Sequence, residues 1–199
     1  MLQKKSEIAK IAASVFAKYG FSKTTLEDIS NSLGMKKNSL YYYFPSKEAI
    51  FGEVLKENLS DLLVELKKIS AGSGTAEEKL KMFFTITENY KKSKGSFYNL
   101  TTNAFLDIRA AIKDLYDQYT KEIFTILNKI ILEGVKSKEF KKCDPNEVAL
   151  ALKNFIESIE LSAFQQSKAK YISEVDFGES DKTKTILLDL IFEGLKSKS

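Results

Sequence analysis

A chain of 199 residues is long enough for one or two compact domains, and 43% hydrophobic with 29% charged residues is an ordinary globular composition. The absence of histidine and the presence of one cysteine, Cys143, exclude an internal disulfide, zinc sites of His or several Cys, and nucleophiles paired with His. The formal net charge of +4 arises in residues 1–50, which hold 8 lysines against 4 acidic residues. Such a basic first part is typical of a protein that meets a polyanion through one end.

Helical spacing of apolar residues runs through nearly the whole chain, and only 2 prolines and 9 glycines interrupt it. These features predict an all-α protein. The first helix is expected at residues 2–19, with Gly20 at its end. A second helix is expected from about Leu26, because Thr25 suits the N-cap position and Asp28 three residues later nearly completes a capping box. Gly34 is expected to end it.

The next predicted helix begins almost at once after that glycine and closes at Phe44 and Pro45. Met35 and Leu40 are its expected inward anchors. The side chains left to face outward are polar, cationic or phenolic: Lys36, Lys37, Asn38, Ser39, Tyr41 and Tyr42. Two short helices joined by a glycine turn predict a helix-turn-helix, whose second helix enters the major groove of B-DNA.

The remaining chain is expected to be helical between short polar loops. Ser46, Thr75 and Asp144 are the predicted N-caps of three of these helices. The helices are expected at residues 47–70, 76–90, 97–112, 113–136, 145–168 and 181–196. The first residues lack the apolar core of a signal peptide, and no apolar run reaches 18 residues, which predicts a cytoplasmic protein without a membrane partner.

The stretch IAKIAASVFAKYGFSKTTLEDISNSLGMKKNSLYYYFPSKEAIF resembles the N-terminal DNA-binding domain of TetR-family transcriptional regulators, over residues 1 to about 51. The resemblance implies a helix-turn-helix domain at 1–46, a ligand-binding and dimerisation domain at 47–199, and about nine helices. It implies a homodimer through the last two helices. It also implies a repressor that binds a palindromic double-stranded operator, is released by a small, apolar or aromatic effector, and needs no cofactor.

Carried onto this sequence, the resemblance assigns the DNA contacts to eight residues: Thr25, Lys36, Lys37, Asn38, Ser39, Tyr41, Tyr42 and Lys47. Thr25, Tyr42 and Lys47 are expected to anchor phosphates; the alternatives are a helix cap, a partly buried aromatic and a solvated lysine. The family has Ser or Thr at Lys36 and Gly or Ala at Asn38. Lys36 therefore removes a hydroxyl cap, and Asn38 adds a group that can bond adenine.

Arginine is nearly absent from the chain, since Arg109 is the only one. The guanine contact that arginine usually makes must fall to Lys36 or Lys37, which discriminate less well. An operator rich in A·T pairs is therefore expected.

Aromatic and threonine side chains of the middle helices are the predicted lining of the effector cavity, although aromatics at helical spacing often only fill a core. They are Phe83, Phe84, Thr87, Tyr90, Phe97, Tyr98, Thr101, Phe105, Tyr116, Tyr119, Phe124 and Phe155. The long helix at 47–70 would connect this cavity to the recognition helix. An effector that tilts this long helix would change the spacing of the two recognition helices of a dimer, which must lie about 34–36 Å apart on DNA.

Two other classes of protein remain open. An enzyme or metal site would need converging acids, but the candidates are scattered among lysines as on solvated helix faces: Glu88, Asp107, Asp114, Asp117 and Glu160. The prediction is accordingly neither an enzyme nor a metal protein. The other class is a helical small-molecule carrier or adaptor that does not use its DNA-binding domain. Cys143 could be a redox-sensing thiolate, but a plain loop cysteine is favoured.

Overall fold

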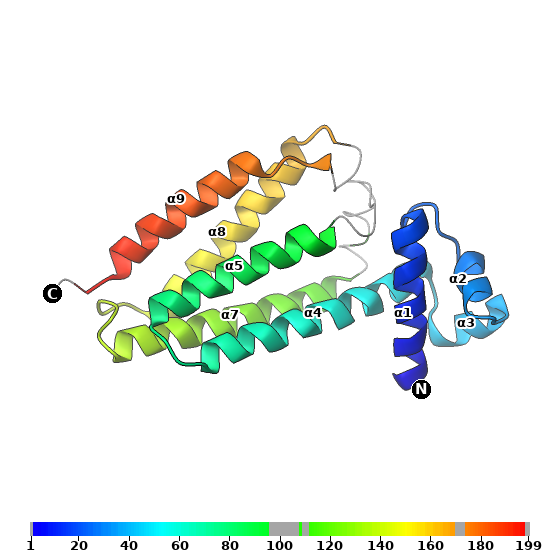
Figure 1. Cartoon of the computed structure of the whole chain (residues 1–199), viewed down its shortest axis with the longest axis horizontal. Coiled ribbons are helices and arrows are strands. Elements are labelled where there is room, and N and C mark those ends of the chain that lie inside the picture. The colour runs from blue at the N-terminus through cyan, green and yellow to red at the C-terminus, as the bar shows by residue number, and fades with distance from the viewer. Residues whose placement is uncertain (1, 96–107, 109–111, 170–173, 198–199) are drawn as a thin grey trace. The chain divides into compact units, whose positions relative to one another are not determined.

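The computed structural model describes residues 2–95, 108, 112–169 and 174–197. These residues form eight helices without a β-strand, which confirms the all-α fold (Figure 1). The helices are α1 Leu2–Tyr19, α2 Leu26–Ser32, α3 Lys37–Tyr43, α4 Lys47–Ala71, α5 Ala76–Gly95, α7 Lys113–Lys136, α8 Pro145–Gln166 and α9 Gly178–Leu195. The helix predicted at 97–112 lies outside the described residues except for Ile108 and Ile112.

The chain divides into two compact units. The first comprises Met1–Leu62, Tyr90–Tyr119 and Ala169–Glu174, and the second comprises Leu63–Asn89, Thr120–Lys168 and Val175–Ser199. Helix α4 thus begins in the first unit and ends in the second. The domain boundary predicted between residues 46 and 47 stays a prediction.

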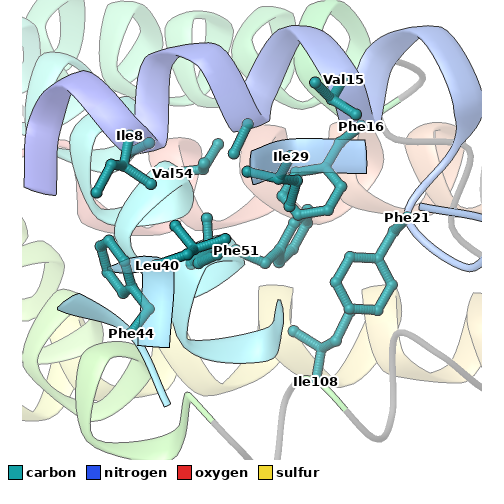
Figure 2. Packing of buried hydrophobic residues seen from close by; sticks show 13 residues of the cluster. Ile8, Val15, Phe16, Phe21, Ile29, Leu40, Phe44, Phe51, Val54 and Ile108 are labelled. Carbon is teal, nitrogen blue, oxygen red and sulfur yellow. The ribbon is translucent and has the colours of Figure 1, made fainter. Parts of the chain in front are cut away.

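The first unit has one hydrophobic core, to which α1, α2, α3 and the start of α4 contribute. Its centre is a cluster of three rings, in which Phe51 of α4 lies 5.4 Å from Phe16 and 4.9 Å from Phe21 between ring centroids. Ile108 reaches the same core from a distant part of the sequence (Figure 2). Ile112 approaches Gly52 of α4, where an added Cβ would lie 3.2 Å from the Ile112 side chain.

The second unit is built from α8, α9 and parts of α4, α5 and α7, and α8 lies alongside α9 (Figure 1). Its buried apolar residues include Leu66, Leu80, Phe83, Ile126, Leu127, Ile130, Ile131, Phe140, Leu152, Phe192 and Leu195. Buried lysines are paired: Lys79 with Glu133 at 2.5 Å, and Lys184 with Glu88 at 2.8 Å. The second pair links α9 to α5. Both pairs are expected, because a lysine that loses its water on burial needs an opposite charge.

Local capping signals were predicted correctly. The Ser46 hydroxyl accepts the Ala49 N–H at 3.2 Å, and Thr75 caps α5 by accepting from the Glu78 N–H at 3.1 Å. Asp144 accepts the Asn146 N–H at 2.8 Å before Pro145 begins α8. These side chains satisfy N–H groups that have no partner within their helices.

Two predicted boundaries were wrong. Most of the loop expected at 91–96 belongs to α5, which continues to Gly95, because lysine and serine are tolerated in a helix; residue 96 lies outside the described residues. The last helix starts at Gly178 rather than near Asp181. Its first N–H donates to the Asp176 carboxylate at 2.8 Å, so capping begins three residues earlier than the apolar pattern indicates.

Candidate nucleic-acid interface

The start of α2 is held by a complete capping box. The Asp28 N–H donates to the Thr25 hydroxyl oxygen at 3.1 Å, and the Thr25 N–H donates to Asp28 Oδ2 at 2.8 Å. The Thr25 hydroxyl also donates to this carboxylate oxygen at 2.7 Å. That hydroxyl bond, together with the one from the Thr25 backbone, lowers the pKa of Asp28. The predicted N-cap is thereby confirmed, and α2 begins at Leu26 as expected.

Asn31, Gly34 and Met35 shape the turn between α2 and α3. Gly34 has φ +63°, a left-handed conformation that favours glycine, and its N–H donates to the Asn31 carbonyl at 3.1 Å. The Met35 N–H donates a hydrogen bond to the Ser30 carbonyl at 2.9 Å. This turn aims α3 away from α2, which is the chain reversal of a helix-turn-helix.

Helix α3 is anchored by one fully buried side chain, Leu40, while Met35 is only partly buried. The helix begins at Lys37, two residues later than the expected anchor Met35. Lys36 occupies the N-cap and makes no side-chain capping bond, as predicted from the absence of a hydroxyl there. The N-terminal N–H groups of α3 are therefore not capped by their own N-cap side chain.

The outward face of α3 is formed by the side chains predicted for it. Exposed residues of this face are Lys36, Lys37, Asn38, Ser39, Tyr41 and Tyr42. Tyr42 is 71% exposed and Tyr41 is 47% exposed, large values for aromatic residues. Lysine, amide, hydroxyl and phenol groups on one short helix suit both phosphate oxygens and base edges.

The other two predicted DNA contacts differ in surroundings. Thr25 is exposed but engaged with Asp28, and Lys47 is partly buried. The Lys47 ammonium donates to the carbonyls of Phe21 and Thr24 at 2.8 and 2.9 Å. Sequence reasoning missed these bonds, because no local pattern connects a lysine to carbonyls more than twenty residues earlier.

The capping box carries a pH-dependent prediction. Asp28→Asn should destabilise the protein at pH 7, since the neutral amide accepts the two Thr25 bonds less strongly. The folded pKa of Asp28 is lowered, so its contribution is complete above the unfolded pKa of about 3.9 and is lost as pH falls through the folded pKa. Urea denaturation of variant and wild type should therefore differ at pH 7, and the difference should shrink as the pH falls from about 4 through the lower folded pKa of Asp28.

Glu27→Gln is the matched control, because Glu27 is an exposed acid in the same first turn but not part of the capping box. It should change the unfolding midpoint less than Asp28→Asn does. An equal effect of both variants at pH 7 would show that only net charge matters at this position.

The predicted effector residues are distributed over both units. Phe83 and Phe84 have ring centroids 5.3 Å apart in the second unit, where Phe124 and Phe155 are partly buried. The Thr87 hydroxyl donates to the Phe83 and Phe84 carbonyls of its own helix. Partly buried tyrosines Tyr90, Tyr116 and Tyr119 belong to the first unit. Phe97, Tyr98, Thr101 and Phe105 lie outside the described residues, and the whole set stays a prediction.

The candidate acids do not converge in the described part of the chain. Glu88 pairs with Lys184 at 2.8 Å, Asp117 pairs with Lys113 at 2.6 Å, and Asp114 is exposed. Asp107 and the Glu160 side chain lie outside what is described.

Cys143 is partly buried, and its burial raises the thiol pKa. Among the described residues, no three His, Cys, Asp or Glu side chains are grouped as metal ligands, and no helix is long and apolar enough to cross a membrane.

Comparison with known proteins connects this architecture with transcriptional regulators. The family model described as "Bacterial regulatory proteins, tetR family" matches residues 8–54. The regulator RutR of Escherichia coli K12 is 28% identical over 151 residues, which cover 73% of this chain and 68% of RutR.

Two further similarities cover most of the chain. The negative regulator IcaR of the icaADBC biofilm operon, from Staphylococcus aureus strain Newman, is 28% identical over 180 residues, covering 86% of this chain and 94% of IcaR. The crystal structure of a transcriptional regulator from Cytophaga hutchinsonii superposes with a TM-score of 0.82 at 25% identity. That match covers 98% of this chain and 99% of the other.

Proposed function

Because the chain belongs to the TetR family of bacterial regulatory proteins, whose members in these comparisons are DNA-binding regulators and not enzymes, we propose that it is a ligand-responsive repressor. It binds a palindromic operator as a homodimer and leaves it when a small molecule binds. The name of IcaR as a negative regulator supports repression. The observation that carries the proposal is the exposed face of α3.

The operator contacts proposed for this face divide by chemistry. Lys36 and Lys37 are cations at the start of the helix, where they reach phosphates or the acceptor edge of guanine. Asn38 can bond adenine N6 and N7. The exposed phenols of Tyr41 and Tyr42 suit phosphate oxygens. With no arginine in the first domain, A·T pairs are the expected majority in each half-site.

The proposed dimer forms through α8 and α9. Large apolar side chains are exposed on both helices: Leu150 on α8, and Ile186 and Leu190 on α9, the last two 61% and 63% exposed. Covering such side chains stabilises association, since apolar burial contributes about 25 cal/mol per Å². A two-fold dimer presents two copies of α3, which must match half-sites about 34–36 Å apart.

Release by an effector is proposed to act through α4. This helix starts three residues after Phe44, the C-cap of α3, and its last turns belong to the second unit, as do Phe83, Phe84 and Phe124. A small apolar or aromatic molecule held among those side chains would tilt α4. A shift of a few ångströms would then take one recognition helix out of register with its half-site.

The test against the rival, a carrier or adaptor that does not use its DNA-binding domain, is the salt dependence of DNA binding. Duplexes would first be selected from a random pool on the wild-type protein. Each neutralised phosphate contributes about 0.9 to the slope of log affinity against log salt, so a repressor dimer should show a steep, negative slope. A carrier would yield no enriched inverted repeat and a slope near zero.

A further inference from the structure

The ammonium group of Lys47 is partly buried against the backbone of the first unit. It donates to the Phe21 carbonyl at 2.8 Å and to the Thr24 carbonyl at 2.9 Å, and it lies 4.3 Å from the centroid of the Phe21 ring. Two carbonyls and an aromatic face replace much of its water. Burial accordingly lowers the pKa of Lys47, while the nearby Glu48 opposes this effect.

The carbonyls bound by Lys47 belong to the turn between α1 and α2. Gly20 starts this turn at φ +79°, and its carbonyl accepts from both the Thr24 N–H at 3.1 Å and the Thr24 hydroxyl at 2.8 Å. Thr24 is almost completely buried. The turn is therefore held from inside by Thr24 and from the start of α4 by Lys47.

One peptide group in this turn is held at both ends by opposite charges. The peptide that joins Thr24 to Thr25 has its carbonyl bound by the Lys47 ammonium and its N–H bound by the Asp28 carboxylate at 2.8 Å. A cation at the oxygen and an anion at the N–H both favour this one orientation of the peptide dipole. That orientation fixes the backbone of Thr25, the N-cap from which α2 starts.

We propose that Lys47 is a positioning residue for operator binding: it ties the start of α4 to the Thr24–Thr25 peptide and so sets the start of α2, rather than neutralising a DNA phosphate itself. This rests on the proposed function. The Lys47 bonds give α4 a second connection to the helix-turn-helix, besides the short link from α4 to α3. Any displacement of the first turn of α4 therefore also displaces the turn before α2.

The experiment compares Lys47→Met with Lys23→Met, which removes the same charge from an exposed lysine of the same turn. Amide hydrogen exchange of the free protein is measured first. In Lys47→Met the Thr24, Thr25 and Asp28 amides should exchange about tenfold faster, because a charged hydrogen bond to the turn is lost. In Lys23→Met they should keep wild-type rates. Lys47→Gln, which is neutral but retains an N–H donor, should lie between, and it carries the test if the methionine variant does not fold.

Salt dependence on a selected duplex is measured second. A lysine that neutralises a phosphate in each protomer contributes about 1.8 to the slope of the dimer. If Lys47 is a positioning residue, Lys47→Met should weaken DNA binding at least about tenfold. Its slope of log affinity against log salt should equal that of Lys23→Met. Unchanged amide exchange, or a slope reduced by about 1.8 relative to Lys23→Met, would overturn the proposal. If the wild type itself shows no salt-dependent binding, the proposed function fails, while the exchange rates still decide whether Lys47 holds the turn.

Discussion

Replacing Phe51 by alanine should lower the free energy of unfolding by about 3–5 kcal/mol, the usual cost of removing a buried phenylalanine. The side chain is fully buried and contacts both Phe16 of α1 and Phe21 of the following turn (Figure 2). Its loss removes ring contacts on two sides and leaves a cavity between α4 and α1. Because a domain of this size has about 5–15 kcal/mol of stability, the variant should melt far below the wild type.

The matched control for Phe51→Ala is Val64→Ala on the same helix. Val64 is half exposed, so its truncation should change stability by no more than about 0.5 kcal/mol. Both variants are measured by urea denaturation followed by circular dichroism. A loss below about 1 kcal/mol for Phe51→Ala would contradict the packing of α4 into the core that α1, α2 and α3 form.

Local chemistry explains which parts of the fold were predictable from the sequence. Each of these parts depends only on neighbours within four residues. Side chains of Thr25, Asp28 and Asp144 accept backbone N–H groups at the start of a helix, and Gly34 adopts the left-handed conformation of the turn. Their effect can therefore be derived without knowing the fold. The exposed face of α3 was predictable for a related reason. In a short helix whose inward residues are Leu40 and Tyr43, the other side chains face outward.

Features that depend on distant residues were not predictable in the same way. Ile108 fits any amphipathic helix, and nothing in its neighbourhood indicates that it belongs to the core around Phe16 and Phe21. Lys47 is expected from the sequence to anchor a phosphate, or else to be a solvated lysine, yet it binds two carbonyls of a turn that ends 23 residues earlier. Such contacts exist only once the chain has folded.

The double variant Lys37→Ala, Tyr42→Ala should lose operator binding by at least about 100-fold. A dimer would lose four contacting side chains, and each base or phosphate contact contributes on the order of 1–3 kcal/mol. Both residues are exposed, so the fold should be little affected. The variant should remain a dimer in light scattering, because neither residue belongs to α8 or α9.

The chain supplies a closely matched control for this variant. Lys18 and Tyr19 are also an exposed lysine and an exposed tyrosine, but they end α1 rather than forming the face of α3. Lys18→Ala, Tyr19→Ala removes the same charge and the same ring from the same domain. Its affinity for the operator should stay within about threefold of the wild type, as expected when only general charge is lost.

A gel shift at fixed salt, with wild type, double variant and matched control on one selected duplex, tests the role of α3 most directly. The predicted result is a bound complex for the wild type and the Lys18, Tyr19 control, and none for the Lys37, Tyr42 variant at the same concentration. Equal binding by all three proteins would contradict the assignment of α3 as the recognition helix.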